Sequence, residues 1–224
     1  MSHACFISFK KEDAYYRDRI VEKLGKDNIM GKTLDRWINS EDLDYVMQVI
    51  RDEYMTGTSV TLYLIGAHSS EKEGRDALGR NMQSFMIREL QATLFDRKGN
   101  RRSGLLGIVL PEMEDKIYGG KSTCPHCGAC TQTMTITDDT VLKEFSANYW
   151  LKKKEGCNHY EEDGRFCVLV RYSEFMNGDN AEKYIENGAT EAKRIIVNTG
   201  CLDFLAYKAK IGVTEKIAQR NTNN

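Results

Sequence analysis

The stretch Ser59-Val-Thr-Leu-Tyr-Leu-Ile-Gly66 decides the fold class, because it is rich in β-branched residues and almost continuously apolar. Strands that are buried on both faces of a parallel sheet have this composition. Outward from it, similar short apolar runs occupy residues 4–9, 105–110 and 166–172, and a weaker run occupies residues 29–34. The sequence therefore predicts five buried strands.

Helical periodicity fills the segments between these strands. Apolar residues recur at helical spacing in residues 13–24, with Asp13 as the expected N-cap, and again in residues 44–55, 82–96 and 181–194. Alternating strands and helices require crossover connections. We therefore expect an α/β fold with a doubly wound, five-stranded parallel sheet, whose ligands bind beyond the carboxyl ends of the strands.

The 224 residues are expected to form a single domain, residues 1–224, that carries one insertion. The insertion lies at about residues 112–164, between the fourth and fifth predicted strands. A connection of this length is too long for an ordinary loop. It is therefore expected to hold its own structure or a function.

Composition excludes several classes of protein. The 32 basic and 33 acidic side chains give a formal net charge of -1, so no global field attracts nucleic acid or an anionic membrane. The apolar runs are shorter than the roughly 18 residues that span a bilayer. The N-terminus lacks the basic leader of a secretory signal. We expect a cytoplasmic protein with no membrane partner, and a nucleic-acid partner is disfavoured because it would need a local basic patch.

The common nucleotide and hydrolase motifs are absent. The chain has no Gly-x-Gly-x-x-Gly after its first strand, no P-loop, no Gly-x-Ser-x-Gly and no His-Glu-x-x-His. Glu89 is of interest instead, because it follows Phe85 by four residues and shares its helix face. A carboxylate against an apolar wall can stabilise a developing cation. On spacing alone, a solvated helix charge is the more common alternative.

Three segments resemble a known family. Phe6-Ile-Ser-Phe9, followed by a charged loop and a helix, resembles the first strand of Toll/interleukin-1 receptor (TIR) domains. Ile50-Arg-Asp-Glu-Tyr-Met55 and Thr58–Gly66 more specifically resemble the bacterial TIR-like family that includes the NAD-consuming subunit of Thoeris antiphage systems. The resemblance covers residues 4 to about 110 and resumes at Phe166-Cys-Val-Leu-Val-Arg-Tyr-Ser-Glu-Phe175, which is similar to the family's last strand.

The resemblance implies a flavodoxin-like fold and an NAD glycohydrolase or ADP-ribosyl cyclase that acts in antiphage defence. Family members carry a catalytic glutamate on the helix after the third strand, usually four residues after a tryptophan. Phe85 stands at the tryptophan position and Glu89 at the glutamate position, although residues 69–80 make a longer approach to this helix than is usual. With NAD as substrate, Glu89 is the predicted catalytic carboxylate.

Other residues of the resembling segments are candidates to bind NAD. Similarity assigns Phe6 and Ser8 to the nicotinamide and ribose pocket, with core packing as the alternative for Phe6. Lys10 is a candidate for the diphosphate. Trp37 lies in a loop that joins neighbouring subunits in TIR domains, so it suits either stacking or self-association. His68 follows the central strand and is a weaker candidate. A downstream effector that senses the product is a further expected partner.

Cysteines crowd into the predicted insertion. Cys124-Pro-His-Cys127-Gly-Ala-Cys130 has the spacing of a zinc knuckle, which supplies two ligands. Cys157 and His159 are the best candidates for the other pair, with Cys130 or Cys167 as substitutes. We expect a structural zinc ion, and a set of free thiols is the alternative.

Two other functions stay open at this stage. The chain could be a non-catalytic TIR interaction module that recruits partners through the Trp37 loop and the cysteine-rich insertion. A zinc-dependent nucleic-acid binder is the third hypothesis, although the basic run at residues 152–154 has no interleaved aromatic residues for base stacking.

Overall fold

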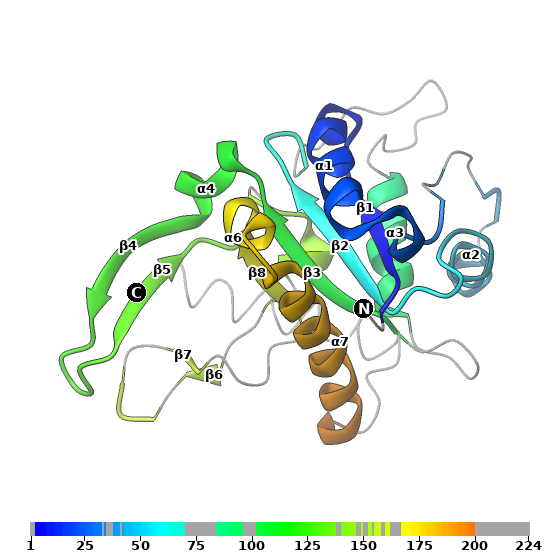
Figure 1. Cartoon of the computed structure of the whole chain (residues 1–224). Helices are drawn as coiled ribbons and strands as arrows, with labels where there is room; N and C mark the ends of the chain where they lie inside the picture. The colour runs from blue at the N-terminus through cyan, green and yellow to red at the C-terminus, as the bar shows by residue number, and fades with distance from the viewer. Residues whose placement is uncertain are drawn as a thin grey trace.

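A four-stranded parallel sheet forms the centre of the molecule (Figure 1). Its strands are β1 (Cys5–Ser8), β2 (Val60–Ile65), β3 (Gly104–Val109) and β8 (Cys167–Arg171), in the order β1-β2-β3-β8. Each pairing is parallel. The predicted α/β class is therefore confirmed.

The strand predicted at residues 29–34 is present only as a single bridge. Ile29 pairs with Cys5 in parallel, and the Met30 N–H donates a hydrogen bond of 2.8 Å to the Cys5 carbonyl oxygen. Gly31, with a φ of 89°, then turns the chain. Counting this bridge, the order of the predicted strands is 2-1-3-4-5, which is compatible with a flavodoxin-like fold. A fifth strand is not confirmed.

The computed structural model describes residues 3–32, 34, 38–40, 42–69, 84–95, 102–137, 140–146, 149, 152–153, 155–157, 160–161 and 167–199. Within these ranges, no helix combines the length and the apolarity that crossing a membrane requires.

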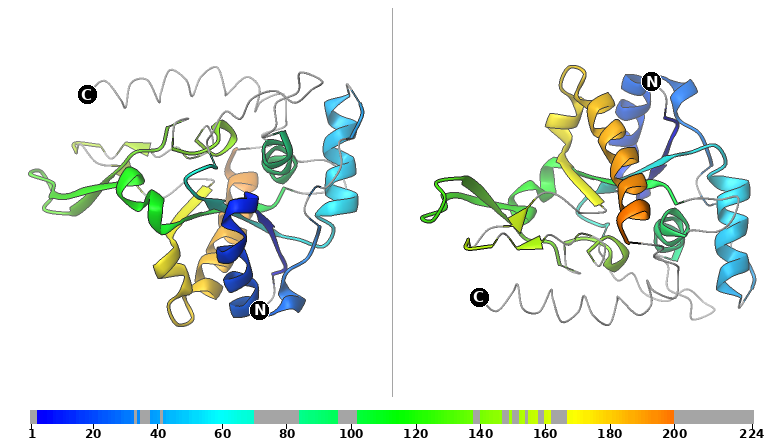
Figure 2. Two further views of the ribbon diagram at one scale, coloured as in Figure 1. Left: turned by 90° about the horizontal axis from the view of Figure 1, so that it is seen from above. Right: turned by 90° about the horizontal axis from the view of Figure 1, so that it is seen from below.

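Helices cover both faces of the sheet (Figure 2). One face packs against α1 (Ala14–Leu24) and α7 (Asn180–Thr199), and the other packs against α3 (Ser84–Leu94) and α5 (Lys143–Ser146). Alternation along the strands explains this arrangement. In β2, for example, Leu62 and Leu64 belong to the first core, whereas Tyr63 belongs to the second.

A third apolar cluster lies beside β1. The helix predicted at residues 44–55 forms as α2 (Leu43–Val49), which continues into a π-helical turn, η3 (Ile50–Tyr54). Met47 and Ile50 from this segment pack with Phe6 of β1 and with Phe95, which follows α3. This cluster therefore fixes α3 relative to β1.

The chain between β3 and β8 forms two small antiparallel hairpins. In chain order its elements are α4 (Pro111–Ile117), β4 (Tyr118–Thr123), β5 (Cys130–Met134), α5, β6 (Lys152–Lys153) and β7 (Tyr160–Glu161). The remaining elements are η1 (Lys11–Asp13), η2 (Lys26–Asn28) and α6 (Tyr172–Met176). In Figures 1 and 2 the hairpins project past the β8 side of the sheet, away from α2.

Candidate functional site

Glu89 lies in the middle of α3, on a face that packs against the sheet. Only 1% of this residue is exposed. The Thr93 hydroxyl, one turn further on, donates 2.8 Å to the Glu89 carbonyl oxygen and lies 2.8 Å from the Thr61 hydroxyl on β2. Glu89 therefore faces the sheet and not the solvent, so the alternative of a solvated helix charge is wrong.

The carboxylate of Glu89 is held from two segments that are distant in the sequence. The Ser8 hydroxyl, at the carboxyl end of β1, donates a hydrogen bond of 2.7 Å to Oε2. The backbone N–H of Leu34 donates a hydrogen bond of 3.1 Å to Oε1. The carboxylate therefore sits where β1 ends, next to β2. At this point the chain connections leave the sheet in opposite directions, which is where α/β folds bind ligands.

Burial strongly perturbs the acidity of this group. Loss of solvation raises the pKa of Glu89 to about 7, although the hydrogen bonds from Ser8 and Leu34 act in the opposite direction. A carboxyl group with this pKa changes its charge near neutral pH. Such shifts are concentrated at functional sites, although structural groups can show them too.

The two aromatic candidates lie close to this carboxylate. Phe6 is buried in the third apolar cluster, and the half-buried Phe85 packs against the same cluster. A Cβ at Gly31 would meet the Tyr54 carbonyl oxygen and would lie 2.8 Å from the Phe6 ring. Gly31 therefore lets the chain pass close to Phe6 on its way to Leu34. Core packing describes Phe6 in this structure.

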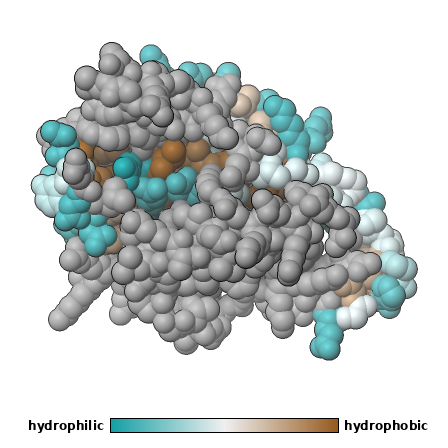
Figure 3. Space-filling model, turned by 180° about the vertical axis from the view of Figure 1, so that it is seen from behind, coloured by the Kyte–Doolittle hydropathy of each residue, from teal (hydrophilic) through white to brown (hydrophobic). Residues whose placement is uncertain are grey.

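A small hollow opens beside the carboxylate. It is open to solvent, has room for about one water molecule, and is lined by Leu34, Ile38, Ser40, Val46, Ile50 and Arg88. Seen from behind, the half of the molecule that carries α2 and α3 shows hydrophobic surface next to hydrophilic surface (Figure 3). Leu34 links the hollow to Glu89, because its side chain lines the hollow and its N–H contacts the carboxylate.

The other predicted binding residues are less clearly part of this site. Lys10 follows β1 and is largely buried, and it lies close enough to Asp13 to lower the pKa of that carboxyl group. His68 is exposed in the turn after β2. Trp37 lies outside the described residues, so its predicted role stays a prediction.

Sequence reasoning missed the environment of Asp13. This residue is the N-cap of α1 by position, but its side chain makes no capping hydrogen bond, which corrects the expectation. The carboxylate is buried against Gly66, where an added Cβ would lie 2.7 Å from Asp13 Cγ, and Oδ2 has no hydrogen-bond partner. Burial, followed by the charge of Glu112, raises the pKa of Asp13 to about 6. Gly66, directly after β2, is the sequence feature that could have indicated this close approach of Asp13.

The structure brings three of the four predicted metal ligands together. The Sγ atoms of Cys124, Cys127 and Cys157 all lie within 4.8 Å of one another. Cys124 is buried, Cys127 is exposed and Cys157 is half-buried. Desolvation and the thiols of Cys127 and Cys124 raise the pKa of Cys157 to about 11. This cluster could bind a metal ion.

The other candidate metal ligands are His159, Cys130 and Cys167. His159 lies outside the described residues. Cys130 is exposed on β5 and is not part of the cluster of three thiols. Cys167 is fully buried in the apolar core at the start of β8. Neither of the two substitute cysteines is therefore placed as a ligand.

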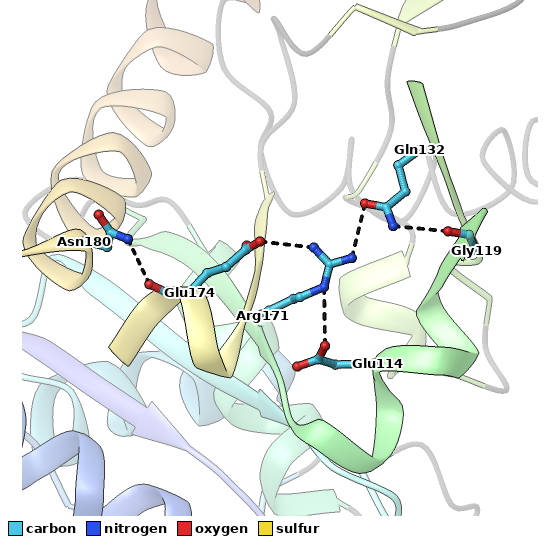
Figure 4. Close-up of polar contacts among 6 residues, drawn as sticks. All are labelled: Glu114, Gly119, Gln132, Arg171, Glu174 and Asn180. Atoms are coloured by element: carbon cyan, nitrogen blue, oxygen red, sulfur yellow. Dashed lines mark hydrogen bonds and ion pairs between the residues drawn. The ribbon is translucent and has the colours of Figure 1, made fainter. Parts of the chain in front are cut away.

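Arg171, at the end of β8, ties the first hairpin to the sheet (Figure 4). Its guanidinium donates a hydrogen bond of 3.2 Å to Gln132 Oε1 on β5 and lies 3.4 Å from Glu114 Oε2 on α4. It also lies over the Tyr118 ring, 3.8 Å from the centroid. Arg171 therefore helps to anchor the base of the β4–β5 hairpin, where Tyr118 and Met134 also pack against the apolar core.

Comparison with known proteins adds no relative. No family model matches the sequence, and no curated protein matches it significantly. The features that bear on function are the buried carboxylate, the thiol cluster and the resemblance of the sequence segments.

Proposed function

We propose that this protein is a TIR-like enzyme that cleaves the bond between nicotinamide and ribose in NAD, with Glu89 as the catalytic carboxylate. The observation that carries the proposal is the hydrogen bond between Glu89 and Ser8, because it places a buried carboxylate at the tip of β1. The resemblance of residues 4 to about 110 to bacterial TIR-like proteins supplies the substrate.

The reaction suits a single carboxylate. Nicotinamide leaves NAD as a neutral base from a cationic precursor, so its departure needs little acid catalysis. The ribose gains oxocarbenium character as the bond breaks. An ionised Glu89 would stabilise this positive charge, and the low polarity of its surroundings would strengthen the interaction.

The position of the site supports a nucleotide ligand. Parallel α/β sheets bind ligands at the carboxyl edge where the chain connections diverge, and Ser8 lies at that edge. The hollow lined by Leu34 and Arg88 is adjacent, but it has room for about one water molecule, so part of a dinucleotide could extend into it only after Leu34 moves. Arg88 would then face the negatively charged diphosphate.

Substrate binding has to change one contact. The Leu34 N–H occupies the Glu89 oxygen that a ribose hydroxyl would take. A hydroxyl group can replace this donor, since it offers the carboxylate an equivalent hydrogen bond. We propose that Ser8 keeps its contact and orients the carboxylate, while Leu34 moves away from Glu89 when NAD enters.

The remaining assignments follow the resemblance. Phe85 would pack against the nicotinamide ring or the ribose, Lys10 would hold a phosphate, and Trp37 would serve stacking or self-association. Phe6 would form part of the wall of the nicotinamide and ribose pocket. The product would be ADP-ribose or a cyclic nucleotide signal read by an effector in cytoplasmic antiphage defence.

A non-catalytic interaction module is the second candidate function. The observation that favours it is that both oxygens of Glu89 already have donors, as in a structural carboxylate. In this case the Ser8–Glu89–Leu34 contacts would only hold α3 and the segment after Gly31 against β1.

Mass spectrometry of the products separates these functions. The protein is incubated with NAD over a range of concentrations that includes conditions favouring self-association. We expect free nicotinamide together with ADP-ribose or a cyclic isomer. Unchanged NAD at every concentration, with no thermal shift on adding NAD, would favour the interaction module.

A further inference from the structure

The second cluster of functional groups lies on the two hairpins. Cys124 and Cys127 lie in the connection between β4 and β5, and Cys157 lies in the turn between β6 and β7. These turns are 30 residues apart in the sequence from Cys127 to Cys157, yet their thiols meet. Some interaction must therefore hold these three thiols close together.

Apolar burial does not supply that interaction. The residues of β4 after Tyr118 are exposed, and β6 and β7 contribute only two residue pairs. Two-stranded hairpins without a hydrophobic face are marginally stable in water. Something other than a core has to hold the two turns together.

The backbone forms two tight turns beside the cysteines. The Gly128 N–H donates 2.9 Å to the Cys124 carbonyl oxygen, and the Cys124 N–H donates 2.9 Å to the Ala129 carbonyl oxygen. Gly128 and Gly156 have φ values of 71° and 72°, which favour glycine in both turns. Each turn therefore closes tightly beside a cysteine.

The geometry points to a zinc ion bound by the thiolates of Cys124, Cys127 and Cys157, which staples the tips of the two hairpins together. A tetrahedral ion with Zn–S bonds of about 2.3 Å holds its sulfur ligands about 3.8 Å apart. The three Sγ atoms already lie within 4.8 Å of one another, so small side-chain rotations suffice.

Soft thiolate ligands in a tetrahedral arrangement select zinc over magnesium, calcium or manganese. Binding replaces the thiol protons with the metal, and this coupling is how structural zinc stabilises small folds. A fourth ligand would close the site, and the sequence predicts His159 for this position. The role is structural, because an ion bound by Cys124, Cys127 and Cys157 would hold the tips of two hairpins together.

Metal analysis of the full-length protein, purified under reducing conditions, tests this proposal. We expect about one zinc ion per chain. The Cys127→Ser variant should lower zinc affinity by at least roughly tenfold, whereas Cys130→Ser is the matched control and should keep it. Cys130 is an exposed thiol on the same hairpin but lies outside the cluster.

Cobalt substitution supplies a second measurement that does not depend on the fold of a variant. Co²⁺ in the wild-type protein should show the visible bands of a tetrahedral site and the near-ultraviolet bands of sulfur-to-metal charge transfer. Absence of these bands, or equal loss of zinc in Cys130→Ser and Cys127→Ser, would overturn the proposal. Neither measurement depends on NAD cleavage, so the two proposals can fail separately.

Discussion

The site around Glu89 and the cysteine cluster are organised in opposite ways. Glu89 is buried, and its partners Ser8 and Leu34 come from segments that the apolar core already holds in place. The three thiols lie on hairpins that bury little apolar surface, and two of them are at least partly accessible to solvent.

This difference separates two ways of placing a functional group. In the first region the apolar core determines the fold, and folding moves a carboxylate out of water into an unfavourable, buried environment. In the second region the ligands come first, and their metal would create the order that the core does not provide. Perturbing each region should therefore have a different kind of effect.

The largest expected effect is the loss of structure in the hairpins when metal is removed. Structural zinc contributes on the order of 10 kcal/mol in small metal-dependent folds, which far exceeds what the β6–β7 pairs can supply. Chelation should therefore abolish the protection of β4–β7 amides against hydrogen exchange while β2 and β3 stay protected. Equal protection with and without the chelator would show that the hairpins are stable without a metal.

The second effect is the cost of burying Glu89. Its pKa of about 7 in the folded protein exceeds the reference value of 4.5. The folded protein therefore retains a proton that the unfolded chain has lost, and stability falls as pH rises from about 4.5 through about 7. The penalty above this range is at most about 3 kcal/mol.

The Glu89→Gln variant removes this penalty while keeping the contacts, since its amide can accept from Leu34 and donate to Ser8. The variant should be more stable than the wild type at pH 8, and the difference should shrink towards pH 5. Thermal unfolding at both pH values measures it. A difference that does not vary with pH would contradict the buried, titrating carboxyl group.

The third effect is the loss of the hydrogen bond that Ser8 of β1 donates to Glu89. Ser8→Ala should destabilise the protein at neutral pH by about 1–3 kcal/mol, because it leaves Glu89 Oε2 without a partner. It should also raise the pKa of Glu89 further, since the Ser8 hydrogen bond lowers it. The pH profile of nicotinamide release would then move to higher pH. Ser173→Ala, at an exposed position on α6, should change neither quantity.

The smallest effect is at the base of the first hairpin. Arg171→Gln removes the ion pair with Glu114 and the contact with Tyr118. Because the side chain is partly exposed, the loss should be only about 1 kcal/mol. Faster hydrogen exchange should be confined to the amides of β4 and β5. Arg19→Gln on α1 is the control and should leave the exchange rates of these amides unchanged.

The sheet was predictable because its strands carry their own signal. Continuous apolarity at residues 59–66 and 105–110 reflects burial on two faces, and both strands form. The run at residues 29–34 is weaker, and only Ile29 pairs with the sheet. Pro111, directly after Leu110, starts α4, where its fixed φ suits the first turn of a helix.

The candidate sites were predictable in part. The Cys124–Cys127 pair has the recognisable spacing of a zinc knuckle, and Glu89 was singled out by its place in segments that resemble TIR-like proteins, because its spacing from Phe85 alone did not distinguish it from a solvated charge. The contact with Leu34 and the burial of Asp13 against Gly66 depend on tertiary packing across 55 and 53 residues, which no local pattern encodes. The backbone N–H of Leu34 carries no side-chain signal at all.

Nicotinamide release from NAD, followed across pH for the wild type, Glu89→Gln and Glu182→Gln, tests the central claim most directly. Glu182 is an exposed glutamate on α7 and serves as the control. We expect wild-type and Glu182→Gln rates to rise through about pH 7 as Glu89 ionises, and Glu89→Gln to be slower by at least about 100-fold. Equal turnover by Glu89→Gln and the wild type would contradict the account.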